Sequence, residues 1–169
     1  AISTIMELQD NQIDDLVKLL LPLDNQLDKR LNYVQKTMKI GKKEALEYIV
    51  TDNPVLWAKV YLDWEARDYQ FAILTEGKKS KKLVLRLGRR LGKTDDMCVL
   101  ILWFAYTQYN KGPNNQYDII IATPYETQID LIFKRLHQLI EVSPLLGSLI
   151  CRDVHHNICL NINGVVSNI

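Results

Sequence analysis

The sequence predicts an α/β fold in which a parallel sheet is flanked by helices. An apolar, strand-like run at 83–87 is followed by a Gly-rich turn and an apolar helix over 93–109. A second apolar run at 117–122 is followed by an amphipathic helix over 125–141. Strand, helix, strand and helix in succession favour parallel strands joined by right-handed crossovers.

The first third of the chain is predicted to be helical. Apolar residues recur there at helical spacing, with proline or glycine after several of the segments. Asn53 before Pro54 is a typical helix start, because the amide caps free N–H groups and proline fits the first turn. We expect residues 1–52 to form a helical lid or contact subdomain and residues 53–169 to hold the sheet. The expected helices cover 4–21, 24–40, 43–50, 54–62 and 68–77.

The end of the chain is predicted to be β. Ile158, Leu160 and Ile162 alternate with polar residues, and Asn163-Gly164 is a dipeptide that favours a type I′ turn. We therefore expect an antiparallel hairpin in addition to the parallel sheet. Ser143-Pro144 is expected to end the preceding helix.

Composition indicates a soluble globular domain and argues against two classes of protein. The 169 residues are 47% hydrophobic and 24% charged, which is enough apolar material for a core. The longest apolar run, at 97–106, is too short to cross a bilayer, and three unevenly spaced cysteines do not indicate a disulfide framework. The net charge is +1, but residues 78–93 hold eight Lys and Arg and no acid. This run could steer DNA phosphates, and residues 78–82 could equally be a solvated loop beside a nucleotide-directed part. The chain starts without Met and ends in a predicted strand, so we expect it to be a piece of a longer protein.

Residues 84–96 are predicted to bind a nucleotide. Gly88 and Gly92 lie in the turn between the first strand and the helix that starts at Lys93. In such loops backbone N–H groups face phosphate, a lysine neutralises the β- and γ-phosphates, and a hydroxyl ligates Mg²⁺. Lys93 and Thr94 supply that lysine and that hydroxyl.

Other residues are expected to complete this ATP site. Arg89 and Arg90 could clamp the triphosphate or stabilise transition-state charge, and either could equally point outward as a solvated or DNA-facing charge. Gln70 offers one donor and one acceptor, the pair that an adenine edge needs, although a lone Gln on a helix could equally be an ordinary surface residue. Lys93, Arg89 and Arg90 are the expected catalytic residues, and Thr94 is the expected Mg²⁺ ligand. The expected ATP-binding residues are Gln70, Gly88, Arg89, Arg90, Leu91, Gly92, Lys93, Thr94 and Asp95.

Three stretches of the chain read Arg-Asp-Tyr-Gln at 67–70, Arg-Leu-Gly-Arg-Arg-Leu-Gly-Lys-Thr at 86–94, and Ile-Ala-Thr-Pro-Tyr-Glu-Thr-Gln at 121–128. Together they resemble the N-terminal ATPase of tailed-phage large terminases, the motors that package viral DNA. The Gly-Arg-Arg-x-Gly-Lys-Thr form, whose first glycine is displaced by one position from the general phosphate-loop pattern, is typical of that family. The third stretch matches the family's Ala-Pro-Thr-like segment with Thr and Pro exchanged. The resemblance covers roughly residues 53–169.

This resemblance implies a P-loop NTPase fold of the RecA-like kind, with Gln70 at adenine and residues 88–94 around the phosphates. It implies that ATP hydrolysis drives double-stranded DNA into a procapsid in the host-cell cytoplasm. It implies a ring of copies, a portal protein and a small terminase subunit as partners, and no membrane. The Walker B acid, the catalytic glutamate and an RNase H-like nuclease domain are then expected beyond residue 169. Arg135 and Arg152 are candidates for a trans-acting arginine finger by exclusion.

Two further functions fit the same residues. A superfamily-2-like helicase or translocase shares the upstream glutamine and the core sheet, and a non-catalytic nucleotide-binding assembly module would bind ATP without hydrolysing it. No apolar run in the chain ends in Asp-Glu, so the chain by itself is expected to lack a catalytic base. Cys151, His155, His156 and Cys159 could serve a metal site, but their spacing favours ordinary strand and loop residues.

Overall fold

The computed structural model describes residues 2–84, 93–112 and 116–169, and it is a mixed α/β fold. The α-helices are α1 (Asp10–Leu20), α2 (Leu27–Met38), α3 (Lys42–Asp52), α4 (Pro54–Tyr61), α5 (Asp68–Lys79), α6 (Lys93–Thr107), α7 (Glu126–Glu141) and α8 (Pro144–Leu149). The short 3-10 helices are η1 (Ile5–Glu7) and η2 (Tyr109–Lys111). The strands are β1 (Gln116–Asp118), β2 (Ile150–Val154), β3 (Asn157–Ile162) and β4 (Val165–Asn168).

The sheet formed by the described residues is mostly antiparallel. Its order is β1-β4-β3-β2, with β2–β3 and β3–β4 antiparallel and only β1–β4 parallel. The expected parallel sheet is therefore not seen in this part of the chain. The reason is connectivity: β2, β3 and β4 follow one another through two-residue turns, and turns that short permit only antiparallel pairing.

The two strands expected in the parallel sheet have different outcomes. Residues 85–87 of the first lie outside the described residues, and residues 83–84 are not in a strand. The second, expected over 117–122, is observed only as β1, which ends at Asp118. Ile119 N still donates to Asn168 O at 2.8 Å, and the chain then leaves the sheet with Ile120 89% exposed. Residues 119–122 thus have no strand partner in the part of the chain that the structure describes.

The predicted C-terminal hairpin is confirmed. Ile162 pairs with Val165 across a two-residue turn, and both turn residues have positive φ, 54° at Asn163 and 83° at Gly164. Positive φ at both positions is the property of a type I′ turn, which matches the right-handed twist of the strands. The alternating Ile158, Leu160 and Ile162 are all buried.

The helical predictions are confirmed in kind and adjusted at their ends. The segment expected over 4–21 is divided into η1 and α1, and the one expected over 24–40 is α2, which ends at Met38 with Lys39 left-handed. Asn53 Oδ1 accepts from the N–H groups of Val55 and Leu56 at 3.0 and 3.4 Å, as the cap prediction requires.

Helix α8 was not expected. Ser143-Pro144 ends α7 as predicted, but it also starts α8, because Ser143 Oγ accepts from Leu146 N at 3.2 Å and Pro144 occupies the first turn. This is the same start signal as Asn53-Pro54. A cap residue followed by proline therefore marks a helix start at both places.

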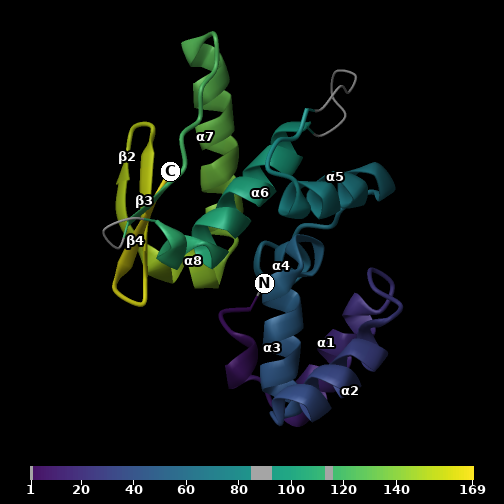
Figure 1. The fold of residues 1–169 in the computed structure, drawn as a ribbon. Coiled ribbons are helices and arrows are strands. Elements are labelled where there is room, and N and C mark those ends of the chain that lie inside the picture. The colour runs from purple at the N-terminus through teal and green to yellow at the C-terminus, as the bar shows by residue number, and fades with distance from the viewer. Residues whose placement is uncertain (1, 85–92, 113–115) are drawn as a thin grey trace.

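One hydrophobic cluster joins the helical part to the sheet. Figure 1 shows α6 in the middle, with α4 and α5 on one side and α7 and the sheet on the other. The buried members of the cluster include Leu46 of α3, Trp57 of α4, Leu102 of α6, Leu136 of α7 and Leu160 of β3. Helix α6 is thus covered on several sides, as its nearly uniform apolar character predicts. None of the described helices is long and apolar enough to cross a membrane.

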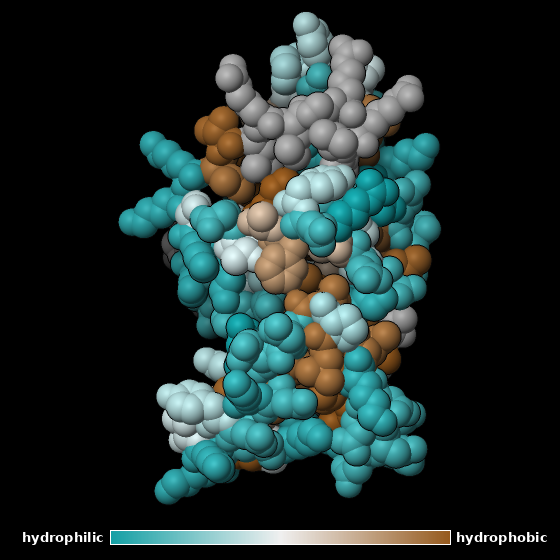
Figure 2. Space-filling model, turned by 90° about the vertical axis from the view of Figure 1, so that its right-hand side faces the viewer, coloured by the Kyte–Doolittle hydropathy of each residue, from teal (hydrophilic) through white to brown (hydrophobic). Residues whose placement is uncertain are grey.

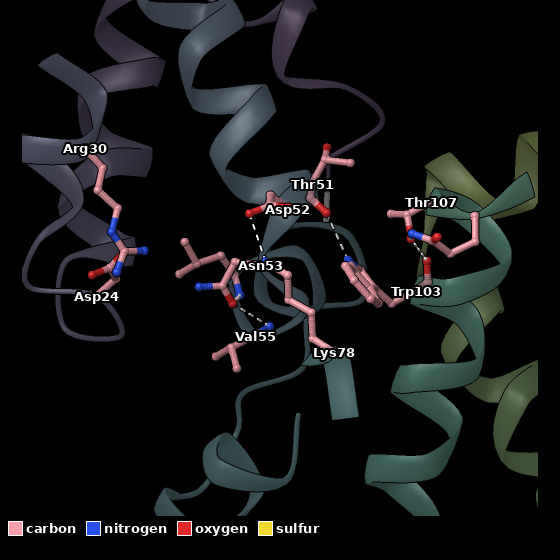
Figure 3. A network of polar contacts seen from close by, with 11 residues as sticks. Asp24, Arg30, Thr51, Asp52, Asn53, Val55, Lys78, Trp103 and Thr107 are labelled. Atoms are coloured by element: carbon pink, nitrogen blue, oxygen red, sulfur yellow. Dashed lines mark hydrogen bonds and ion pairs between the residues drawn. The ribbon is translucent and has the colours of Figure 1, made fainter. Parts of the chain in front are cut away.

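Polar contacts also connect α3 to α5 and α6. Trp103 Nε1 donates to Thr51 O at 2.9 Å, and Lys78 Nζ lies 2.9 Å from Asp52 Oδ2, so two contacts meet at the end of α3 beside the Asn53 cap (Figure 3). The face drawn in Figure 2 is largely hydrophilic, with an apolar band between the hydrophilic areas.

Candidate functional site

The predicted phosphate-binding lysine and hydroxyl lie in the first turn of α6. Lys93 is the first residue of the helix and is half-buried, and Thr94 follows it and is exposed. Gly88, Arg89, Arg90, Leu91 and Gly92 lie outside the described residues. The helix beyond Thr94 enters the core, since Cys98, Val99 and Leu102 are completely buried.

Asp95, predicted as a nucleotide-contacting residue, is bound by an arginine from the next helix. Arg135 of α7 donates from Nε to Asp95 Oδ1 at 2.7 Å and from an Nη to Oδ2 at 3.3 Å. Both side chains are about two-thirds buried. A bidentate guanidinium–carboxylate contact of this kind is strong and directional, so it fixes α7 against the start of α6. Arg135, one of the two arginine-finger candidates, is thus engaged within the chain.

Asp96, the residue next to Asp95, is buried and has no hydrogen-bond partner among the described residues. Its side chain is 0% exposed, and neither carboxylate oxygen has a hydrogen-bond partner in the part of the chain that the structure describes. Burial, together with the neighbouring charge of Asp95, raises the pKa of Asp96 to about 7. The reason is that an ionised carboxylate loses its hydration there and gains no compensating donor.

These contacts determine the charge at the start of α6. An α-helix N-terminus carries free N–H groups and a partial positive charge, and Lys93 adds a full one. Two acids in the same turn would oppose an anion, but Asp95 is neutralised by Arg135 and Asp96 is partly protonated near neutral pH. The residues present therefore fit a phosphate group, and the exposed hydroxyl of Thr94 is a suitable oxygen ligand for Mg²⁺.

Gln70, the predicted adenine-reading residue, lies in the first turn of α5 and is 5% exposed. Its Oε1 accepts from Arg67 N at 3.0 Å, so the amide oxygen caps the start of its own helix. The helix-capping contact is local and is the kind that Gln at the third helical position commonly makes. An adenine at this amide would share the Oε1 acceptor with the cap.

The basic segment before the loop is divided between structural and solvent-facing lysines. Lys78 is half-buried and paired with Asp52, whereas Lys79, Lys81 and Lys82 are exposed. Arg152, the other arginine-finger candidate, is exposed on β2. The exposed lysines are the ones able to meet a DNA backbone.

The four residues considered as a metal set in the sequence separate in the structure. Cys159 is buried on β3 and donates to Asn168 Oδ1, and Cys151 is exposed on β2. His155 and His156 instead lie beside Asp130 of α7. Sequence reasoning missed Asp130, Asp96 and the Asp95–Arg135 pair, because no local pattern joins residues 26 or 40 positions apart.

Comparison with protein-family models, with curated proteins and with solved structures found no match to this chain.

Proposed function

We propose that this chain is the ATP-binding part of a viral DNA-packaging motor of the large-terminase type. The observation that carries the proposal is the sequence Gly-Arg-Arg-Leu-Gly-Lys-Thr at 88–94, whose last two residues open a helix that runs into the core. A basic residue and a hydroxyl in the exposed first turn of such a helix are what phosphate and Mg²⁺ binding need.

The proposal assigns a role to the charged and hydroxyl-bearing residues of the loop and of its surroundings. Mg²⁺ bound with the nucleotide supplies charge neutralisation at the phosphates. Lys93 adds its ammonium charge there, and Thr94 offers its hydroxyl to the ion. Arg135 holds Asp95 in place, so that the acid does not repel the nucleotide. Arg89 and Arg90 are proposed to stabilise the charge that develops when water attacks the γ-phosphate in line.

The partner that the motor moves is double-stranded DNA. Lys79 at the end of α5 and Lys81 and Lys82 after it are exposed before the proposed loop, where they would meet DNA phosphates close to the nucleotide site. By the same resemblance we propose that copies of the full protein form a ring, docked on a portal protein and supplied by a small terminase subunit in the host cytoplasm. The catalytic acids and the nuclease are proposed to follow this chain.

The test is packaging by the full-length protein with single lysine variants. Lys93→Ala is expected to abolish ATP turnover and DNA packaging, because the phosphates lose their direct counter-charge. Lys36→Ala, which removes an exposed lysine of α2, is the matched control and is expected to leave both activities intact. Turnover and packaging that survive Lys93→Ala would refute the assignment of this loop. ATP binding without turnover by the full-length protein would instead favour a non-catalytic module.

A further inference from the structure

The β2–β3 turn and helix α7 bring together three side chains of the types that commonly ligate metals in proteins. His155 and His156 form the two-residue turn between Val154 and Asn157, and Asp130 lies in the second turn of α7. His156 Nε2 is 2.6 Å from Asp130 Oδ1, and the two imidazole rings are stacked with centroids 3.6 Å apart. One ligand atom from each of the three residues lies within 4.8 Å of the other two.

His156 is held toward α7. Its φ is 53°, in the left-handed region that residues other than Gly and Asn adopt at a cost of about 1 kcal/mol. The ring packs 5.3 Å from the ring of Phe133, one helical turn along α7 from Asp130. The turn therefore presents its second imidazole to the helix, whereas His155 beside it is exposed.

A hollow of about 430 Å³ adjoins the three residues. His137 and Asp153 also line it, with His137 Nε2 2.7 Å from Asp153 Oδ1, so the hollow holds a second histidine–aspartate pair. Lys134 contributes the opposing positive charge at this hollow. Two carboxylates and one lysine thus line the hollow, while the hydrogen bond to Asp153 raises the pKa of His137 and favours a second positive charge there.

We propose that Asp130, His155 and His156 bind a divalent transition-metal ion, of which Zn²⁺ is the type case. Two imidazole nitrogens and one carboxylate oxygen form a donor set that suits zinc and its first-row neighbours. Bonds of about 2.0–2.1 Å in a tetrahedral site put ligand atoms roughly 3.3 Å apart. The side chain of Asp130 is 53% exposed and His155 is exposed, so small side-chain rotations can close the present 4.8 Å span.

The ion would take the place of a proton. His156 Nε2 and Asp130 Oδ1 lie at hydrogen-bond distance, and a metal between them would displace the proton of that bond to solvent while both atoms become ligands. Three protein ligands leave a fourth position for water from the adjoining hollow, as in catalytic rather than structural zinc sites. Without a metal, the same contact is a partly exposed hydrogen bond between the two side chains.

The experiment is a Zn²⁺ titration of the untagged chain, with affinity read by competition with a chelating dye and geometry read from the visible spectrum of bound Co²⁺. The exposed thiol of Cys151 is replaced in every protein by Cys151→Ser, so that it cannot capture zinc. His155→Ala, Asp130→Asn and His156→Asn are each expected to weaken Zn²⁺ binding by about tenfold or more, since second-shell changes alone cost that much. Asn tolerates positive φ, so His156→Asn keeps the turn while removing the imidazole.

The third histidine of the chain is the matched control. His137→Ala removes an imidazole from the same hollow but outside the proposed ligand set, and it is expected to change zinc affinity by less than about threefold. Zn²⁺ is also expected to raise the melting temperature of the parent and of His137→Ala, but not of the three ligand variants. Equal zinc affinity in the parent and the ligand variants, or a loss in His137→Ala as large as theirs, would overturn the proposal.

Discussion

Arg135 of α7 binds both carboxylate oxygens of Asp95 in the first turn of α6, at 2.7 and 3.3 Å. The pair connects the helix that follows the proposed phosphate loop to the helix that follows the Thr123-Pro124 segment. The ion pair is therefore a direct physical contact between these two helices.

Arg135→Ala is expected to destabilise the fold by about 1 kcal/mol, because it leaves the half-buried Asp95 without its counter-charge. The free energy of unfolding in urea measures this. Asp95→Asn together with Arg135→Ala completes a double-mutant cycle, in which the coupling energy isolates the pair. A coupling energy of zero would mean that the contact does not hold the helices together.

Asp96→Asn is expected to remove a pH dependence of stability. The pKa of Asp96 rises from 3.8 to about 7 on folding because of burial, so between these values the folded state holds a proton that the unfolded state has lost. Stability therefore falls as pH rises from 4 to 7, by an amount on the order of 3 kcal/mol. Thermal unfolding at pH 5 and pH 8 measures the fall, which Asp96→Asn should reduce. An unchanged fall in the variant would show that another group causes it.

Trp103→Phe is expected to cost about 1 kcal/mol more stability than Trp57→Phe. Trp103 Nε1 donates to Thr51 O at 2.9 Å, whereas Trp57 Nε1 has no hydrogen-bond partner among the described residues. Both substitutions leave similar voids, and only the first leaves a carbonyl oxygen unpaired. Urea unfolding of the two variants measures the difference. An equal loss of unfolding free energy in the two variants would mean that the Trp103–Thr51 hydrogen bond does not stabilise the contact between α6 and the end of α3.

Replacing Lys81 and Lys82 together by alanine is expected to weaken binding of double-stranded DNA about tenfold and to lower the salt dependence by about two ion equivalents. Both lysines are exposed next to the proposed loop. The control is the double replacement of Lys29 and Lys36 by alanine, which removes the same charge from α2. Fluorescence anisotropy with labelled DNA at several salt concentrations separates the two. Equal losses would indicate a charge effect without a defined DNA-binding surface.

Local sequence signals predict most of the helices and the C-terminal hairpin, but few of the contacts between elements. Asn53-Pro54 and Asn163-Gly164 act through their own backbone neighbours, and both predictions are confirmed. Among the described residues the expected parallel pairing is seen only between β1 and β4. Strand pairing depends on which segments meet, and β4 takes both β1 and β3 as neighbours. Ser143-Pro144 predicts the end of α7, and the Ser143 side chain also caps the next helix, which the pattern did not predict.

In the candidate sites, too, local positions are predictable from the sequence and long-range contacts are not. Lys93 and Thr94 are predicted at the start of a helix, and α6 does begin at Lys93. Arg135 and Asp130 carry no local signal of their roles, since their partners lie 40 and 26 positions away. Long-range electrostatic contacts of this kind depend on the tertiary fold, which one sequence does not specify by pattern alone.

The most direct test of the central claim is a titration of this chain with fluorescent mant-ATP and Mg²⁺. We expect saturable binding of mant-ATP that unlabelled ATP displaces, and an affinity at least tenfold lower in Lys93→Ala. Removing Mg²⁺ should lower the affinity of the parent but not that of Thr94→Ala. Lys36→Ala should bind as the parent does. Equal mant-ATP affinity in Lys93→Ala and in the parent would contradict the assignment of Lys93 to a nucleotide-binding loop.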